Sequence, residues 1–214
     1  VQQGLIRSKS IIVDSTHMIA NASKQKPKDV LVTAATRLRR VVKKYQPKLI
    51  EKLSKLPSQK ASEEEWMAFL VLLTKQVKQY VPDAEGALKD KLEVADKIIH
   101  DERLLLQKGV QSAIDPDARI GKKSSTRSFF GYKLHLAMTE DEIITGAQIT
   151  TGSADDGKQL IPLISNTLKQ GVVCHEVLGD TAYSSKINLT WLNERSIIPT
   201  IPLNPIVFHG TRNN

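Results

Sequence analysis

Two aspartates that follow short apolar runs could support metal chemistry. Asp14 ends the β-branched run KSIIVD (9–14), and Asp180 ends the run VVCHEVLGD (172–180). Functional residues of open α/β sheets gather at the carboxyl ends of strands, so the two carboxylates converge if these strands are neighbours. Close carboxylates repel each other unless a cation lies between them. Because hard oxygen ligands suit Mg²⁺ or Mn²⁺, we expect Asp14 and Asp180 to form a metal site.

Such a site would be suited to phosphodiester chemistry. Two divalent ions held roughly 3.5–4 Å apart can activate water and stabilise the leaving oxygen. The alternative is that each aspartate caps the turn after its strand, because Ser15 follows Asp14 and Thr181 follows Asp180. The spacing of the residues leaves both interpretations open.

The segments around the two aspartates predict an α/β fold with a mixed sheet rather than a helix bundle. An acidic hairpin turn is expected at Glu140-Asp141-Glu142. The strand before it alternates, with Leu134 on one face and Lys133 and His135 on the other. Apolar or β-branched runs predict strands at 9–14, 129–138, 143–151, 172–179 and 197–201.

Two helices are expected between the later strands. The first starts at Asp155-Asp156-Gly157 and is closed by Gly171. Pro162 lies inside this pattern and should kink the helix or shift its start. The second helix is predicted over residues 184–195.

The middle of the chain is helical by periodicity. One helix is predicted from Asp29, as N-cap, to Tyr45. A second begins at Ser62, which forms an S-x-x-E capping box with Glu65, and ends before Pro82. A third is predicted over residues 88–106, with Gly109 just past its end.

Positive charge is concentrated in the first part of the chain. Residues 1–60 contain 14 Lys and Arg against 3 acidic residues, whereas the whole chain has 31 against 23. The excess can be a solvated helix face or a surface that contacts phosphates, with an affinity that falls as salt rises. The densest group comprises Arg37, Arg39, Arg40, Lys43, Lys44 and Lys48.

Composition excludes several classes of protein. The 214 residues include no apolar run of 18, which excludes a transmembrane helix and predicts no membrane partner. A single cysteine, Cys174, excludes a disulfide framework and a zinc ribbon. It stands beside His175 in a predicted strand, so the two side chains point to opposite faces and should not share a metal. A cytoplasmic location is expected.

Three segments carry a resemblance to the insertion-sequence DDE transposases, in the group with a Y-R-E-K motif around the final glutamate. They cover nearly half of the chain and occur in the order typical of that family. The segment with the FGYK core, residues 115–164, is the most specific of the three. The segments are IIVDSTHMIANASK (11–24), the hairpin region 115–164 and VLGDTAYSSKINLTWLNERSIIPTIPLN (177–204).

The resemblance implies a ribonuclease H-like mixed sheet with a large helical insertion after the first strand. It also implies metal-dependent cleavage of DNA strands and transfer of the freed 3′-hydroxyl to target DNA. Asp14 matches the first metal-binding acid of the family and Asp180 the second. The implied cofactor is Mg²⁺ or Mn²⁺. The implied partner is double-stranded DNA, both transposon ends and target, in a bacterial, nucleoid-associated protein that could be a homodimer.

Two groups of basic residues are expected to contact DNA phosphates. They lie in the predicted helical insertion and on or just before the predicted hairpin. The first group is Arg37, Arg39, Arg40, Lys43 and Lys44, and the second is Lys122, Lys123, Arg127 and Lys133.

The third acid of the family pattern is not found. The chain extends 34 residues past Asp180, and the acid in that span, Glu194, is expected on a helix surface rather than at a metal. We therefore expect a C-terminally truncated form with weak or no activity. The expected segments are 1–27, the first catalytic strand and loop; 28–112, a basic helical insertion; and 113–214, the remaining core without the final helix.

Two other functions remain open. One is a ribonuclease H-like nuclease that only hydrolyses nucleic acid. The other is a non-enzymatic basic DNA-binding or regulatory remnant of a transposable element, in which residues 1–60 supply the binding.

Overall fold

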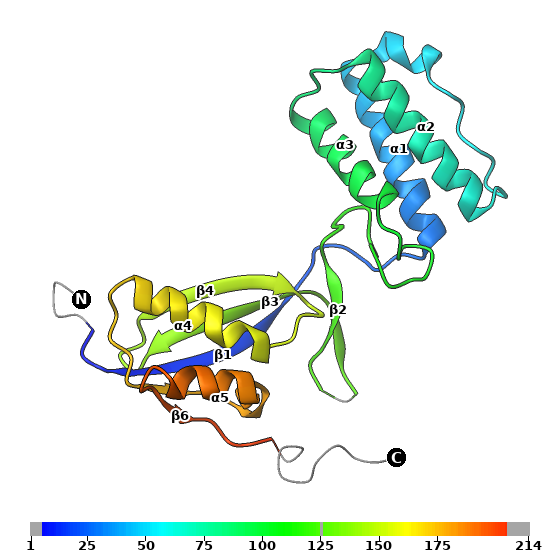
Figure 1. Ribbon diagram of the computed structural model, residues 1–214. Helices are drawn as coiled ribbons and strands as arrows, with labels where there is room; N and C mark the ends of the chain where they lie inside the picture. Colours follow the sequence, from blue (N-terminus) through cyan, green and yellow to red (C-terminus); the bar gives the residue numbers. More distant parts are fainter. Residues whose placement is uncertain (1–5, 125, 205–214) are drawn as a thin grey trace. The chain divides into compact units, whose positions relative to one another are not determined.

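The computed structural model describes residues 6–124 and 126–204, and these form two compact units. The sheet unit comprises the described residues up to Ile19 and those from Ile120 onward. The helical unit comprises Ala20–Arg119. Figure 1 shows that the chain leaves the sheet unit after one strand and returns to it after the helical unit.

The sheet unit is built on a mixed sheet in the order β2-β3-β1-β5-β6, in which β4 also pairs with β3. The β1–β3 and β3–β4 pairs are antiparallel, whereas β1–β5 and β5–β6 are parallel. The strands are β1 (Ser10–Ile19), β2 (Arg119–Lys122), β3 (Ser128–Thr139), β4 (Ile144–Thr151), β5 (Glu176–Leu178) and β6 (Ile198–Thr200).

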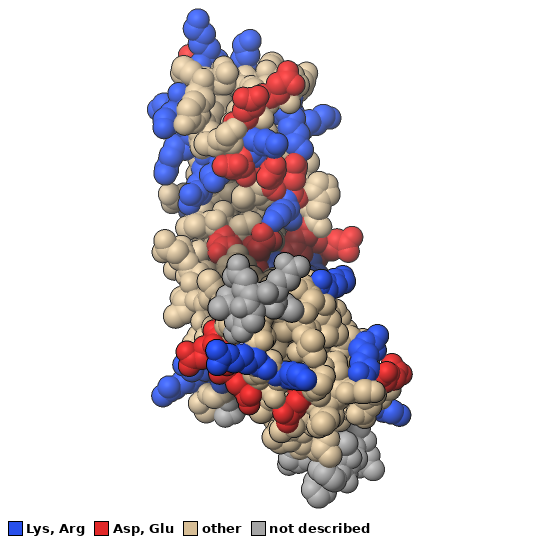
Figure 2. Space-filling model, turned by 90° about the vertical axis from the view of Figure 1, so that its left-hand side faces the viewer, with Lys and Arg blue, Asp and Glu red and all other residues tan. Residues whose placement is uncertain are grey.

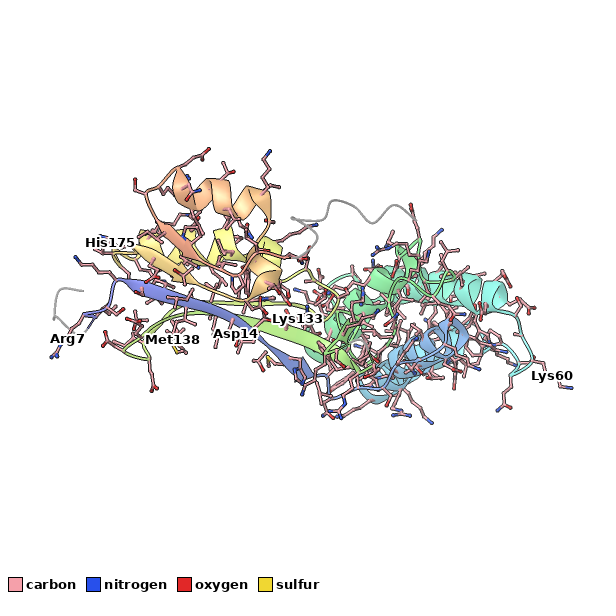
Figure 3. The ribbon with its side chains drawn as sticks, turned by 90° about the horizontal axis from the view of Figure 1, so that it is seen from below. Arg7, Asp14, Lys60, Lys133, Met138 and His175 are labelled. Atoms are coloured by element: carbon pink, nitrogen blue, oxygen red, sulfur yellow. The ribbon has the colours of Figure 1, made fainter. Side chains whose placement is uncertain are left out.

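Two helices, α4 (Leu160–Lys169) and α5 (Lys186–Asn193), cover one face of this sheet (Figure 3). Their apolar side chains pack on Ile11, Val13 and Ala137, which alternate with residues of the other face. On that other face Ile144 and Ile149 are 57% and 61% exposed. Among the described residues the core of the sheet unit therefore lies on one side of the sheet.

The helical unit has its own core between α1 (Pro27–Tyr45), α2 (Glu63–Tyr80) and α3 (Gly86–Ile99). A short 3-10 helix, Pro47–Lys52, follows α1. Buried side chains recur at helical spacing on each helix, so each apolar stripe faces the other two helices. The fully buried residues include Leu31, Leu38, Leu70, Leu73 and Ile98.

Several local predictions are confirmed. The Ser62 hydroxyl accepts from the Glu65 amide (3.2 Å), and the Glu65 carboxylate accepts from the Ser62 amide (2.6 Å), which completes the capping box. The hairpin between β3 and β4 turns at residues 140–142. Pro162 lies in the first turn of α4, where its missing N–H is tolerated, and Gly171 follows the helix with φ +77°.

Other local predictions are wrong. Helix α1 begins earlier than expected: Lys26 is the N-cap and Pro27 the first residue, so Asp29 lies in the first turn. Helix α3 ends at Ile99 instead of continuing to residue 106. The chain folds back there because the carboxylate of Asp101 accepts bonds from the amides of Arg103 and Val110. Strand β2 was not predicted.

Strand β1 is also longer than expected. It continues through Ile19 because β3 supplies a partner for every residue from Ile11 onward, ending with Gly131 opposite Ile19. Asp14 therefore lies in the middle of the strand, not at its end. With these corrections, the structure has the expected mixed α/β sheet and a large helical insertion after the first strand.

Candidate active site

The parallel register of β1 and β5 brings Asp14 and Asp180 to equivalent positions. Ile12 pairs with Leu178, and each aspartate lies two residues further along its chain. Neighbouring strands lie about 4.8 Å apart, and residues two apart point to the same face of a strand. The backbone of Asp180 is still extended (φ −83°, ψ −179°). The two acidic positions are thus adjacent across the strand pair.

Asp14 is exposed on the face of the sheet that α4 and α5 leave uncovered. It lies opposite Leu136 of β3, and its Oδ1 accepts a hydrogen bond from the amide of Ser15 (2.7 Å). Figure 3 shows Asp14 on β1, between the labelled residues of the neighbouring strand. Its strand partner on this face, Leu136, is apolar.

Asp180 is exposed and starts the turn after β5. Its Oδ1 accepts a hydrogen bond from the amide of Ala182 (2.9 Å), which caps the 3-10 helix Thr181–Tyr183. The turn-capping interpretation of this aspartate therefore holds. It does not exclude a metal-binding role, because a carboxylate has about four lone-pair positions for further partners.

Tyr183 follows Asp180 in the turn after β5 and is 1% exposed. A Cβ placed on Gly179 would lie 3.1 Å from its ring and 3.0 Å from Val13, so the ring is packed under the loop before Asp180. The pKa of Tyr183 is raised by burial and then by the charges of Asp156, Asp180 and Asp14. Burial is the main cause of this shift, and the three negative charges add to it.

Asp156 is the member of this group that the sequence did not single out. It stood in a helix-start motif, and its position in space depends on residues far away in the chain. The Nζ of Lys133 donates to Asp156 Oδ1 and to the carbonyl of Ala154, both at 2.9 Å. The Lys133 and Asp156 side chains are 14% and 24% exposed, so this ion pair is largely shielded from water.

Lys133 therefore has protein partners, and its expected phosphate contact stays a prediction. His135, two residues further on the same face, is fully buried. Its Nε2 lies 2.8 Å from Thr150 Oγ1, and its Nδ1 lies 3.8 Å from Asp156 Oδ1. The pKa of His135 is lowered because burial outweighs the attraction of Asp156. The imidazole thus lies on the covered face of the sheet, next to the Lys133–Asp156 ion pair.

The structure also places other residues that bear titratable side chains. His17 lies on β1 opposite Lys133, and its ring is 5.1 Å from that of Phe129. Cys174 is buried and His175 exposed, but both precede β5, so the strand predicted to carry them begins later than expected. Glu194 is exposed at the end of α5, as expected for a helix-surface residue.

The donor set suits a hard cation that keeps part of its water shell. Within residues 6–124 and 126–204, no group of three or more His, Cys, Asp or Glu is arranged to hold a metal ion. Two exposed carboxylates on adjacent positions can still fit Mg²⁺ or Mn²⁺. Such ions are commonly bound through one or two carboxylates, with waters and substrate phosphates as the other ligands.

Basic residues gather at the tip of the β2–β3 hairpin. Lys122, Lys123 and Arg127 are exposed there, and the amide of Lys123 donates to the carbonyl of Arg127 (2.8 Å). The backbone of the turn thus holds these cations near one another. Their exposure makes them suitable for phosphate contacts.

The cations expected on the helical insertion lie on α1. Arg40, Lys43 and Lys44 are exposed, whereas Arg37 and Arg39 are half-buried. Arg39 donates to the carbonyl of Ser54, which gives it a structural partner. Figure 2 shows basic side chains along one edge of this unit, with acidic side chains among them elsewhere.

The strand order and the mixed strand directions form an α/β sheet that is compatible with a ribonuclease H-like fold. The sequence matches the family described as Transposase DDE domain over residues 95–212, more than half of the chain. The chain belongs to this family, and its function is of the transposase type. The match includes Asp156 and Asp180 and begins after Asp14.

Other comparisons add no relatives. No curated protein and no solved structure matches the chain. None of the described helices is long and apolar enough to cross a membrane.

Proposed function

We propose that this chain contributes the two-aspartate part of a DNA-transposing active site, which cleaves DNA strands and transfers a 3′-hydroxyl to target DNA. The observation that carries this proposal is the parallel register of β1 and β5, because Ile12 pairs with Leu178 and each aspartate lies two residues further along its chain. Family membership supplies the reaction class, because proteins of this family act in transposition.

Asp14 and Asp180 are proposed to hold the divalent ion that this family uses, with Mg²⁺ or Mn²⁺ as the candidate. When bound, the metal would supply activation of water and stabilisation of charge on the leaving oxygen. The protein's own part is to keep two carboxylates next to each other. The Ser15 and Ala182 amides each orient one of these carboxylates through a hydrogen bond.

Double-stranded DNA is the proposed partner. In the sheet unit, the exposed cations of the β2–β3 hairpin support this proposal: Lys122, Lys123 and Arg127. In the helical unit, Arg40, Lys43 and Lys44 are exposed and support a second phosphate-binding surface. Such contacts position a duplex without reading its sequence.

Metal binding provides the first test. Calorimetric titration with Mn²⁺ should show weaker binding for Asp14→Asn and for Asp180→Asn than for the unmodified chain. Glu194→Gln is the matched control, because it removes an exposed acid of the same unit away from the paired positions. Equal Mn²⁺ affinity in the unmodified chain and the Asp14→Asn/Asp180→Asn double variant would overturn the proposed site.

Strand transfer provides the second test. A labelled duplex with a pre-cut 3′-hydroxyl end is incubated with supercoiled plasmid and Mn²⁺. Joining of the label to the plasmid, lost in Asp14→Asn, supports transposition chemistry. Plasmid nicking without joining would instead support a ribonuclease H-like nuclease.

A non-enzymatic DNA-binding role is the second candidate. The exposed cations of α1 favour it, because they lie in a unit with its own core. Duplex binding that is lost on neutralising Arg40, Lys43 and Lys44, and is unchanged in the aspartate variants with Mn²⁺ present, would favour this candidate.

A further inference from the structure

The turn that carries Asp180 is bonded to the loop that carries Asp156. Asn188 of α5 is 3% exposed, and its Nδ2 donates to the carbonyl of Gly157 (2.7 Å) and to that of Tyr183 (3.0 Å). A single buried amide therefore ties the loop before α4 to the turn after β5. Loss of this amide would leave two buried carbonyl groups without their donor.

Backbone contact brings the same two segments together. A Cβ on Gly157 would lie 2.5 Å from the carbonyl oxygen of Ala182, a distance that real side chains do not tolerate. Glycine is thus required for the loop to lie against the turn. Asp155 shapes the loop, since its Oδ1 accepts from the amide of Gly157 (3.0 Å).

The loop is in turn fixed to the sheet by Lys133. This residue lies on β3, opposite His17 of β1, and its Nζ bonds both the Asp156 carboxylate and the Ala154 carbonyl. Bonds and contacts therefore connect β3 to the 154–157 loop, and this loop to the turn after β5. In that turn the carboxylate of Asp180 accepts a hydrogen bond from the amide of Ala182. Asp14 lies on β1, which pairs directly with β3.

We propose that Lys133, Asp156 and Asn188 form a brace that sets the position of Asp180 relative to Asp14. They are positioning residues and need not touch a metal or DNA. This inference rests on the proposed function, because it assigns them to the same two-aspartate site. Residues that orient metal ligands affect metal affinity by about 10- to 100-fold.

Two substitutions that change the local charge in opposite directions distinguish a brace from an electrostatic effect alone. Lys133→Met removes a positive charge near the site, which by Coulomb attraction alone would strengthen Mn²⁺ binding. Asp156→Asn removes a negative charge, which would weaken it. A brace predicts that both variants weaken Mn²⁺ binding, by about 10-fold, and that Lys133→Arg retains most of the affinity.

A matched control is available in the helical unit. Lys78 and Asp96 form an ion pair at 2.7 Å, and Lys78→Met should leave Mn²⁺ binding unchanged. Tighter Mn²⁺ binding in Lys133→Met would overturn the brace. Unchanged binding in both Lys133→Met and Asp156→Asn would overturn it as well.

Hydrogen exchange tests the brace without any metal. The Ala182 amide is bonded to Asp180, so its exchange rate reports how well the turn is held. Asn188→Ala and Lys133→Met should each speed exchange at Ala182 by about 10-fold or more, while an amide within α1 stays unchanged. Unchanged exchange at Ala182 would overturn the brace.

The two measurements also separate failure of the brace from failure of the proposed function. If Asp14→Asn weakens Mn²⁺ binding but the brace variants change neither readout, the site exists and the brace does not. If Asp14→Asn leaves Mn²⁺ binding unchanged, the proposed site is wrong. Should Lys133→Met not fold, Lys133→Arg and Asn188→Ala still decide the question, with thermal unfolding curves as the check on folding.

Discussion

Asp180 accepts a hydrogen bond from the amide of Ala182 through the same carboxylate that the proposed site uses. One side chain thus has a structural task and a proposed chemical task. Asparagine can keep the first, because its side-chain oxygen also accepts hydrogen bonds, while it loses the negative charge.

This double use gives a first prediction. Asp180→Asn should weaken Mn²⁺ binding with little change in the free energy of unfolding. Asp180→Ala should weaken binding and also lower the free energy of unfolding by about 1 kcal/mol, the usual cost of losing a cap. Calorimetry and urea unfolding measure the two quantities. Equal stability of the alanine and asparagine variants would show that the cap contributes nothing.

The β2–β3 hairpin gives a second prediction, on the salt dependence of DNA binding. Changing Lys122, Lys123 and Arg127 to Gln should reduce the slope of log K against log salt by about 2.7, if each contacts one phosphate. A fluorescent random-sequence duplex, titrated at several salt concentrations, measures the slope. The control changes three exposed lysines of the helical unit, Lys60, Lys75 and Lys89. An equal loss of slope in both triple variants would contradict a specific role for the hairpin.

Buried His135 gives a third prediction. Burial lowers its pKa in the folded protein below the ordinary value of 6.5, so the unfolded chain binds more protons as the pH falls below that value. The contribution of neutral His135 is present above about pH 6.5 and is lost in more acidic solution. The free energy of unfolding, measured in urea at pH 7.5 and pH 5.5, should therefore fall more on acidification in the unmodified chain than in His135→Gln. Parallel losses in the two proteins would contradict this assignment.

The buried thiol gives a fourth prediction. Burial raises the pKa of Cys174 from 9.0 to about 11, so the thiol stays protonated and poorly nucleophilic at pH 8. A disulfide reagent should react with it slowly until urea unfolds the chain. Because the folded pKa is the higher one, Cys174 destabilises the fold as the pH rises from about 9 toward 11. In Cys174→Ala the free energy of unfolding should therefore fall less between about pH 9 and pH 11 than in the unmodified chain.

Local features of the fold could be predicted because their signals lie within a few residues. The Ser62–Glu65 capping box needs two side chains three positions apart. The turn between β3 and β4 needs an acidic break between two β-prone runs. Strand β2 (RIGK) is too short to give such a signal, and it forms beside β3, which pairs with it.

Long-range features of the candidate site could be predicted only in part. Asp14 and Asp180 were identified by their place after apolar runs, and each lies two residues beyond the paired residues Ile12 and Leu178. Asp156 was missed because its partner, Lys133, lies 23 residues away on another element. The covered face of β3 was also hard to assign, since it includes Lys133 and His135, while apolar residues such as Leu134 lie on the exposed face.

The insertion of the helical unit between β1 and β2 has a consequence for folding kinetics. The pairing of Ile19 with Gly131 joins residues separated by the entire helical unit, whereas α1, α2 and α3 contact one another over shorter separations in the chain. Closure of so long a loop is entropically slow, while local helical contacts form early. The three-helix unit should therefore fold first, which shortens the effective loop between β1 and β3. Pairing of β1 with β3 should then follow in a later, slower phase.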